Sequence, residues 1–224
     1  MIRQNPARIY KAQQRGLYEN SNHRWEATFN FESYQDASRS PFGALQILND
    51  ETLGPKQQLT RNVENGNILL IPLVGALEYS LNGEIAYVET NEATWLPAEG
   101  NLILRNPYEE ELINFLYIVF SHSIVTEAET LSINLDSRNS LNPFSLPGSI
   151  KAKMGLFDGR QEALYPIQNP NNGLFVFVIA GAFEVQGRLL EHRDGLALWQ
   201  LEEADMEALS ENAVLLLFEL PIRG

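Results

Sequence analysis

The side chains that most often bind metals or act as nucleophiles are scarce in this chain. It has no cysteine, which excludes disulfides, thiolate catalysis, zinc–thiolate sites and iron–sulfur clusters. It has three histidines, His23, His122 and His192, which lie far apart in the sequence. We find no Ser-His-Asp order, no glycine-rich phosphate loop and no nucleotide fingerprint. Histidines so few and so dispersed are typical of surface or packing positions.

Composition and charge narrow the function classes further. The chain has 224 residues, a formal net charge of -13 and a pI near 4.7, and its basic residues do not cluster. An acidic surface repels phosphate backbones, so we expect no direct nucleic-acid binding. No segment has the eighteen or so continuous apolar residues of a membrane span, and no apolar stretch follows the first basic residues. We therefore expect a cytoplasmic protein with no membrane contact.

An internal repeat indicates the architecture. The run 68–79 recurs as 174–185, with Gly75 and Gly181 at the same place in each copy. Three further landmarks follow in the same order in both copies: the turns Asn82-Gly83 and Gln186-Gly187, then Trp95 and Trp199, then the apolar runs 112–120 and 213–220. Four shared landmarks in one order predict two copies of the same fold.

The repeated segments have the two-residue period of strands. Leu77, Tyr79 and Leu81 alternate with polar residues, and Asn-Gly between two such runs favours a tight hairpin. Pro72 cannot donate to a β-ladder, so its strand must be bulged or at an edge there. We therefore predict an all-β chain with two antiparallel barrels in tandem, at 1–125 and 148–224, joined by a linker at 126–147 that is rich in Ser, Asn and Asp.

Several stretches together resemble the pirin family, including its bacterial quercetinase-like members. The stretches are His23–Tyr34, Phe42–Glu51, Leu73–Tyr79, Asp194–Trp199 and Val214–Pro221, and Leu48-Asn49-Asp50 is the most specific element. The resemblance covers nearly the whole chain. It implies a bicupin of the RmlC-like superfamily, with two jelly-roll-like cupin barrels and one mononuclear iron or nickel site in the N-terminal barrel.

The family's metal ligands, His-x-His and His-x-Glu, are replaced at the matching positions. Counting back from Gly75, the first set falls on Arg61, Val63 and Asn67, and the alternative register gives Asn62 and Glu64. The second pair falls on Leu104 and Asn106. None of these residues is a histidine, and two are aliphatic. The resemblance therefore implies a degenerate metal site, and we expect no metal, no cofactor and no dioxygenase activity.

The polar residues near the implied mouth of the first barrel suggest a ligand-binding site. Arg61, Asn67 and Asn106 are the candidate ligand-binding residues, and Arg61 with Asn106 could hold a carboxylate or enolate. Our first hypothesis is a binding or regulatory module for a small organic ligand or a protein partner, with no catalytic residue. One rival is a cupin-type enzyme with a non-standard site in the N-terminal barrel. It would be either metal-independent, using Arg61 and a nearby glutamate, with Glu64 and Glu99 as a conceivable acid–base pair, or quercetin 2,3-dioxygenase-like with a weak carboxylate-rich metal site. A purely structural role, with Val63 and Leu104 filling the cavity, is the third possibility.

Overall fold

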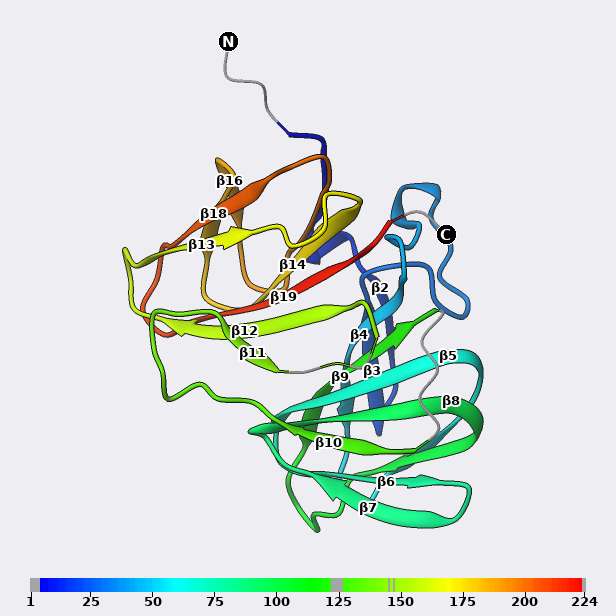
Figure 1. Ribbon diagram of the computed structural model, residues 1–224. Coiled ribbons are helices and arrows are strands. Elements are labelled where there is room, and N and C mark those ends of the chain that lie inside the picture. The colour runs from blue at the N-terminus through cyan, green and yellow to red at the C-terminus, as the bar shows by residue number, and fades with distance from the viewer. Residues whose placement is uncertain (1–4, 122–126, 145, 147, 223–224) are drawn as a thin grey trace. The chain divides into compact units, whose positions relative to one another are not determined.

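The computed structural model describes residues 5–121, 127–144, 146 and 148–222, with only the backbone of 63–65 (Figure 1). Within these residues the chain is all-β, as predicted, and apart from strands it has only the two short 3-10 turns η1 (Ala12–Gln14) and η2 (Ala37–Arg39). No helix in this part of the chain has the length and apolarity needed to cross a membrane.

The chain divides into two compact units. The first-barrel unit contains Gly16–Pro41 and Leu45–Ser132, and the second-barrel unit contains Met1–Arg15, Phe42–Ala44 and Ile133–Gly224. The units are therefore not consecutive along the chain. The interval 126–147 contains a strand paired within each unit, and the boundaries drawn from the sequence at 125 and 147 stay a prediction.

The first-barrel unit is built on one nine-stranded sheet. Its main path is β2-β3-β4-β9-β5-β8-β6-β7, with β10 paired to β8. The strands are β2 (Gly16–Glu19), β3 (His23–Ala27), β4 (Leu45–Leu53), β5 (Gln58–Val74), β6 (Leu77–Leu81), β7 (Glu84–Val88), β8 (Glu92–Arg105), β9 (Ile113–Phe120) and β10 (Glu129–Ser132).

The turn and bulge predicted for this unit are both confirmed. Asn82 and Gly83 have φ of 53° and 95° and join β6 to β7, as an Asn-Gly hairpin requires. The β5–β9 register shifts between Pro72 and Val74, so the proline lies at an irregularity. A second shift occurs in β5 between Glu64 and Asn67, where the β5–β8 ladder is interrupted. This second irregularity lies just beyond Arg61, the first of the candidate site residues.

The core of the first-barrel unit lies on the inner face of this sheet. It is lined by apolar residues of β5, β6, β8 and β9, among them Ile68, Leu70, Leu77, Leu96, Leu102, Leu104, Ile113, Phe115, Tyr117 and Val119. Facing positions on paired strands put their side chains on the same face. The ladder therefore identifies which polar side chains also point into this core.

The second-barrel unit has a six-stranded sheet, β1-β17-β14-β19-β12-β11, and a four-stranded sheet, β13-β18-β15-β16. Its strands are β1 (Ala7–Tyr10), β11 (Asn142–Phe144), β12 (Lys151–Phe157), β13 (Glu162–Pro166), β14 (Asn172–Ala180), β15 (Phe183–Val185), β16 (Arg188–Leu190), β17 (Gly195–Leu198), β18 (Glu203–Ala208) and β19 (Ala213–Pro221). The core contains apolar residues from both sheets. Gln186 and Gly187, with φ of 50° and 68°, repeat the turn of the first copy.

Candidate functional site

Two opposite charges point into the core of the first-barrel unit. Glu51 of β4 pairs opposite Phe115 of β9, and Arg61 of β5 pairs opposite Leu102 of β8. Phe115 and Leu102 are core residues, so the ladder directs the glutamate and the arginine to the same inner face. The first-barrel unit therefore has a charged pair inside it.

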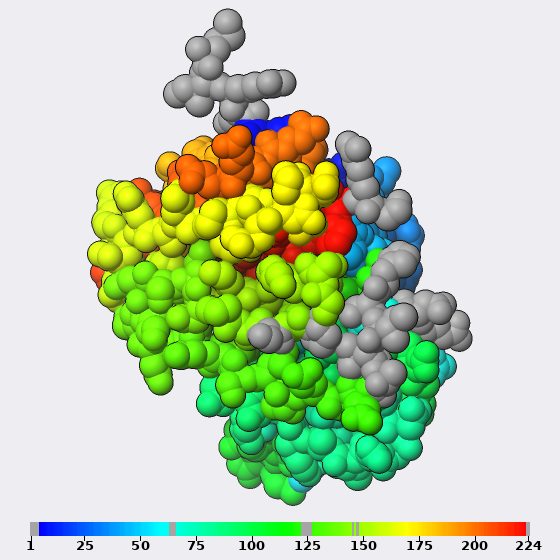
Figure 2. Space-filling view, viewed as in Figure 1, coloured from blue at the N-terminus to red at the C-terminus, as the bar shows by residue number. Residues whose placement is uncertain are grey.

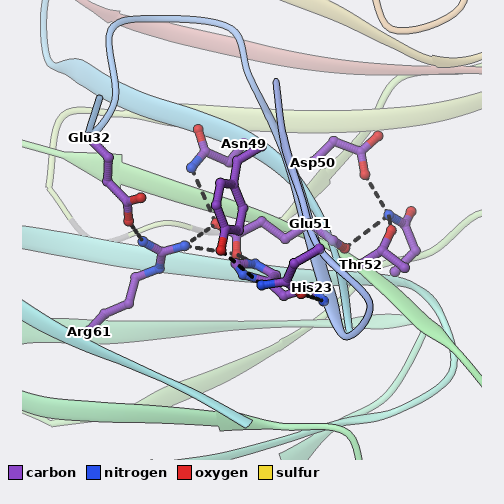
Figure 3. Close-up of polar contacts among 10 residues, drawn as sticks. His23, Glu32, Asn49, Asp50, Glu51, Thr52 and Arg61 are labelled. Atoms are coloured by element: carbon purple, nitrogen blue, oxygen red, sulfur yellow. Dashed lines mark hydrogen bonds and ion pairs between the residues drawn. The ribbon is translucent and has the colours of Figure 1, made fainter. Parts of the chain in front are cut away.

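The pair is in direct contact (Figure 3). Nη2 of Arg61 lies 2.8 Å from Oε1 and 2.9 Å from Oε2 of Glu51, and Nη1 donates to Oε1 of Glu32 over 2.8 Å. The Glu51 side chain is fully buried, that of Arg61 is 10% exposed and that of Glu32 is 52% exposed. A buried carboxylate needs such a partner, because an unpaired charge in the interior costs several kcal/mol or more.

Two aromatic rings hold the guanidinium in place. The Cζ atom of Arg61 lies 4.7 Å from the ring centroid of Phe31 and 4.9 Å from that of Tyr117. Both distances fall within the range of a cation–π contact. Burial raises the pKa of the Tyr117 hydroxyl well above its ordinary range, so the phenol stays neutral. The arginine therefore lies between aromatic faces, with each of its terminal nitrogens donating to a carboxylate.

His23 completes the cluster from the neighbouring strand. Its Nε2 lies 3.1 Å from Oε2 of Glu51, and its side chain is 17% exposed. Burial opposes ionisation of Glu51, but the hydrogen bond from His23 and the charge of Arg61 prevail, so the pKa of this carboxyl lies below its ordinary value. One guanidinium faces two carboxylates, so with neutral imidazole the four side chains, Glu32 included, carry a net charge of -1.

Two polar atoms beside the pair have no hydrogen-bond partner among the described residues. They are Nε of Arg61 and Oδ1 of Asn49, and both are buried. Nδ2 of Asn49 donates to Oε1 of Glu51 over 3.2 Å, so both orphan atoms belong to residues that contact this one carboxylate. Leaving a buried donor or acceptor unpaired costs about 1–3 kcal/mol. The cluster therefore has one unused donor, Nε of Arg61, and one unused acceptor, Oδ1 of Asn49.

The side chain of Asn106 is hydrogen-bonded to backbone groups. Its Nδ2 donates to the carbonyls of Leu53 and Glu111 over 3.1 and 2.7 Å, and its Oδ1 accepts from the Tyr108 amide over 2.9 Å. The backbone amide of Asn106 donates to the backbone carbonyl of Gln57, and Gln57, which directly precedes β5, lies four residues before Arg61. At ~3.3 Å per residue, these four residues of extended chain place Arg61 about 13 Å from Asn106. Arg61 and Asn106 are thus not brought together, and the Asn106 amide binds the turn after β8.

The other predicted positions are dispersed as well. Asn67 is buried beyond the irregularity in β5 and donates to the Leu96 carbonyl over 3.2 Å. Leu104 is fully buried in the core and lies opposite Leu59. The side chains of Val63 and Glu64 are outside the described residues, although the β5 backbone pairs Glu64 with Glu99. His122 is also outside the described residues.

An iron or nickel ion does not fit the side chains described at these positions. The guanidinium of Arg61 is itself a cation, Leu104 has no donor atom, and the amide of Asn106 is used by backbone groups. In the described part of the chain no three histidine, aspartate or glutamate side chains come together to form a metal-binding group. No chemical step through a metal is therefore derived for this site.

The sequence interpretation missed the residues that surround Arg61. Glu51 was considered only as the end of a family signature, and His23 as a packing or surface histidine. One signal was available: Asn49, Glu51 and Leu53 share one face of β4, since they are two residues apart. A glutamate on a face that also carries an apolar core residue needs a buried partner, which can be a cation such as arginine or a set of hydrogen-bond donors. The sequence cannot say which residue supplies that partner.

Comparison with known proteins supports the same fold. Residues 142–220 match the model of the quercetinase C-terminal cupin domain. The chain is 26% identical over 232 residues to a quercetin 2,3-dioxygenase of Escherichia coli (strain K12), covering 95% of this chain and 98% of that protein.

Solved structures agree. The bacterial pirin YhhW of Escherichia coli, crystallised with nickel(II), superposes with a TM-score of 0.83 at 20% identity, covering 97% of this chain and all of that one. The protein YhaK of Escherichia coli has a TM-score of 0.71 at 19% identity, covering 94% and 95% of the two chains. At this identity the structures establish the fold alone. The chain thus has an all-β bicupin fold similar to that of these proteins, and its residues 142–220 match a quercetinase-type cupin domain.

Proposed function

We propose that this pirin-like bicupin acts by binding and not by oxygen chemistry at a metal. The observation that carries the proposal is the Arg61–Glu51 pair inside the first barrel. A guanidinium held by a buried carboxylate occupies a position where the family resemblance implies a metal ligand, and it has no lone pair to donate to a metal ion.

The charge balance of the cluster selects the kind of ligand. Arg61 already faces Glu51 and Glu32, so it has no net charge to offer to a carboxylate or enolate. The partly exposed members are His23 and Glu32, and both present acceptor or donor groups rather than unpaired positive charge. We therefore propose a neutral or cationic small organic ligand, with hydrogen bonds to His23 and Glu32. This replaces the expectation that Arg61 and Asn106 together hold an anion.

A thermal-shift screen of three matched sets of small aromatic compounds, neutral, amine-bearing and carboxylate-bearing, tests this proposal. Hits among the neutral and amine-bearing compounds are expected. Replacing Glu32 by Gln should weaken their binding several-fold, because the outermost carboxylate of the cluster is removed. The matched control is Glu110→Gln, which removes an exposed carboxylate elsewhere. Hits confined to carboxylates, or hits equally affected by both variants, would contradict the proposal.

A metal-independent enzyme is the second candidate, favoured by the His23–Glu51 contact. A histidine with a buried carboxylate behind it has the arrangement of a general base and the group that orients it. Glu51 contacts Nε2 at 3.1 Å, which leaves Nδ1 as the nitrogen available for a substrate proton. The Glu64 and Glu99 pair has no such support, since the Glu64 side chain is not described. Ligands from the screen that are chemically altered by the wild-type protein but not by His23→Gln would favour the enzyme.

The proposal also allows a protein partner instead of a small organic ligand. The net charge of -13 favours a partner with a basic surface and disfavours nucleic acid.

A further inference from the structure

A hollow in the second-barrel unit has the features of a small-molecule site. It has a volume of about 330 Å³ and is bordered by β11, β12, β13 and the segment that follows β13. Its lining is about as polar as it is apolar, and the apolar part includes Leu146, Ile150 and Tyr165. Small-molecule sites have volumes of roughly 300–1,000 Å³, so this hollow is at the lower limit. β11 and β12, drawn yellow-green, are at the surface in Figure 2.

Two lysines border the hollow on the same face of β12. Lys151 pairs opposite Glu219 and Lys153 opposite Leu217, a core residue, so both side chains leave the strand on its inner face. The Nζ atom of Lys153 lies 5.4 Å from the ring centroid of Tyr165. This cation–π contact holds one ammonium group against the aromatic wall. The second ammonium belongs to a residue two positions away, which is about 7 Å along the strand.

Neither ammonium group has a carboxylate partner within the described residues. The chain has four lysines. Lys11 forms ion pairs with Glu191 and Asp194, and Lys56 forms one with Glu109. The two lysines of the hollow form none, in a protein with a net charge of -13. Because carboxylates outnumber lysines and arginines in this chain, composition alone leads us to expect a carboxylate partner for most lysines. Two neighbouring lysines without such a partner are therefore unexpected.

Glu219, which faces Lys151 across the ladder, already accepts four hydrogen bonds. Oε2 of Glu219 accepts from the Tyr165 hydroxyl over 2.7 Å and from the Gln168 amide over 3.0 Å. Oε1 accepts from the Asn169 amide and from Nδ2 of Asn172, both over 2.9 Å. A carboxylate has about four lone-pair sites, so none remains for Lys151. Two ammonium groups beside one saturated carboxylate leave the hollow with a local excess of positive charge.

We infer that this hollow binds a small organic anion with a planar apolar body, such as an aromatic carboxylate. The anionic group lies between the ammonium groups of Lys151 and Lys153, and the ring lies against Tyr165 and the aliphatic wall. The inference concerns the second-barrel unit alone. It does not depend on the site proposed around Arg61.

Titration calorimetry with two probes tests the inference. The first probe is 2-naphthoate, and the second is 2-naphthylmethanol, which keeps the ring system and replaces the charge by a hydroxyl. We expect naphthoate to bind at one site per chain and the alcohol to bind at least ten-fold more weakly. The alcohol cannot form the charge-assisted hydrogen bonds that a carboxylate forms with the two ammonium groups. Equal affinity for the two probes, or no saturable binding of naphthoate, would overturn the inference.

Variants locate the binding. Lys151→Met with Lys153→Met should weaken naphthoate binding at least ten-fold, whereas Lys151→Arg with Lys153→Arg keeps both charges and should stay within about three-fold. The matched control is Lys56→Met, which removes an exposed lysine in the other unit. An equal loss in Lys56→Met and in the double methionine variant would overturn the inference. His23→Gln should leave naphthoate binding unchanged, so a failure here is separate from a failure of the first-barrel proposal. Unfolding midpoints show that each variant is folded.

Discussion

The guanidinium of Arg61 contacts both carboxylate oxygens of Glu51 across the width of one strand. Glu51 belongs to β4 and Arg61 to β5, and β9 lies between them in the sheet. Tyr117 of β9 lies beneath the guanidinium at 4.9 Å. The pair therefore ties three strands together inside the barrel.

Breaking this pair from either side should be costly. Arg61→Met leaves the Glu51 carboxylate buried without its cation, and we expect the free energy of unfolding to fall by about 3–5 kcal/mol. Replacing both residues, with Arg61→Met and Glu51→Leu, should restore much of that loss, because no unpaired charge remains. Urea unfolding of the single and double variants measures the coupling.

The control for this cycle is an exposed ion pair of the same unit. Arg105 contacts Glu78 at 3.2 Å with its side chain 44% exposed, and Arg105→Met should cost about 1 kcal/mol or less. Similar losses in Arg61→Met and Arg105→Met would show that the inner pair contributes no more than a surface one.

The acid stability of the protein should depend on Glu51. Its pKa in the folded chain lies below the ordinary value of about 4.5, because His23 and Arg61 outweigh the effect of burial. A lowered pKa means that its contribution is fully present above the ordinary value and is lost as pH falls through the folded value. The difference in unfolding free energy between the wild type and Glu51→Gln should therefore be constant from about pH 7 to 5 and shrink below about pH 4.5. Urea unfolding at a series of pH values measures it.

The exposed Glu110→Gln variant is the control for that series. A gap between wild type and Glu51→Gln that stays constant down to about pH 3 would mean that the pKa of Glu51 is not involved.

The fold was predictable because its signals are local. Asn82-Gly83 specifies its hairpin by positive φ, and Pro72 requires an irregular ladder wherever it occurs in a strand. The partners of Arg61 were not predictable in this way. Whether Glu51 or another carboxylate reaches the guanidinium depends on the register of β4, β9 and β5, and on the fold of the chain around Phe31. The backbone partners of Asn106 were not predictable for the same reason, because they belong to residues that are distant in the sequence.

Leu104 should behave as a core residue. It is fully buried among apolar side chains, so Leu104→Ala removes packing and leaves a cavity, and we expect a loss of about 2–5 kcal/mol in the free energy of unfolding. Leu17→Ala, at a position that is 61% exposed, should change it by less than about 0.5 kcal/mol. Comparable small effects in both variants would indicate that Leu104 lines an open cavity.

Asn106 should affect stability and not binding. Asn106→Ala removes the partner of the Leu53 carbonyl at the end of β4 and of the Glu111 carbonyl and Tyr108 amide after β8, and we expect a loss of about 1–3 kcal/mol. The exposed Asn101→Ala is the matched control and should be near neutral. The affinity for ligands found in the thermal-shift screen should be unchanged in Asn106→Ala. A loss of affinity without a loss of stability would return Asn106 to the ligand site.

Metal content and oxygen uptake, measured on the same preparation, test the central claim most directly. The protein is purified without chelator or affinity tag, analysed by elemental mass spectrometry, and assayed for oxygen uptake with quercetin. A first barrel that holds the Arg61–Glu51 pair should contain far less than one transition metal ion per chain and consume no oxygen. Iron or nickel near one per chain, together with oxygen uptake that a chelator abolishes, would contradict the account and require metal ligands that the Arg61–Glu51 arrangement does not provide.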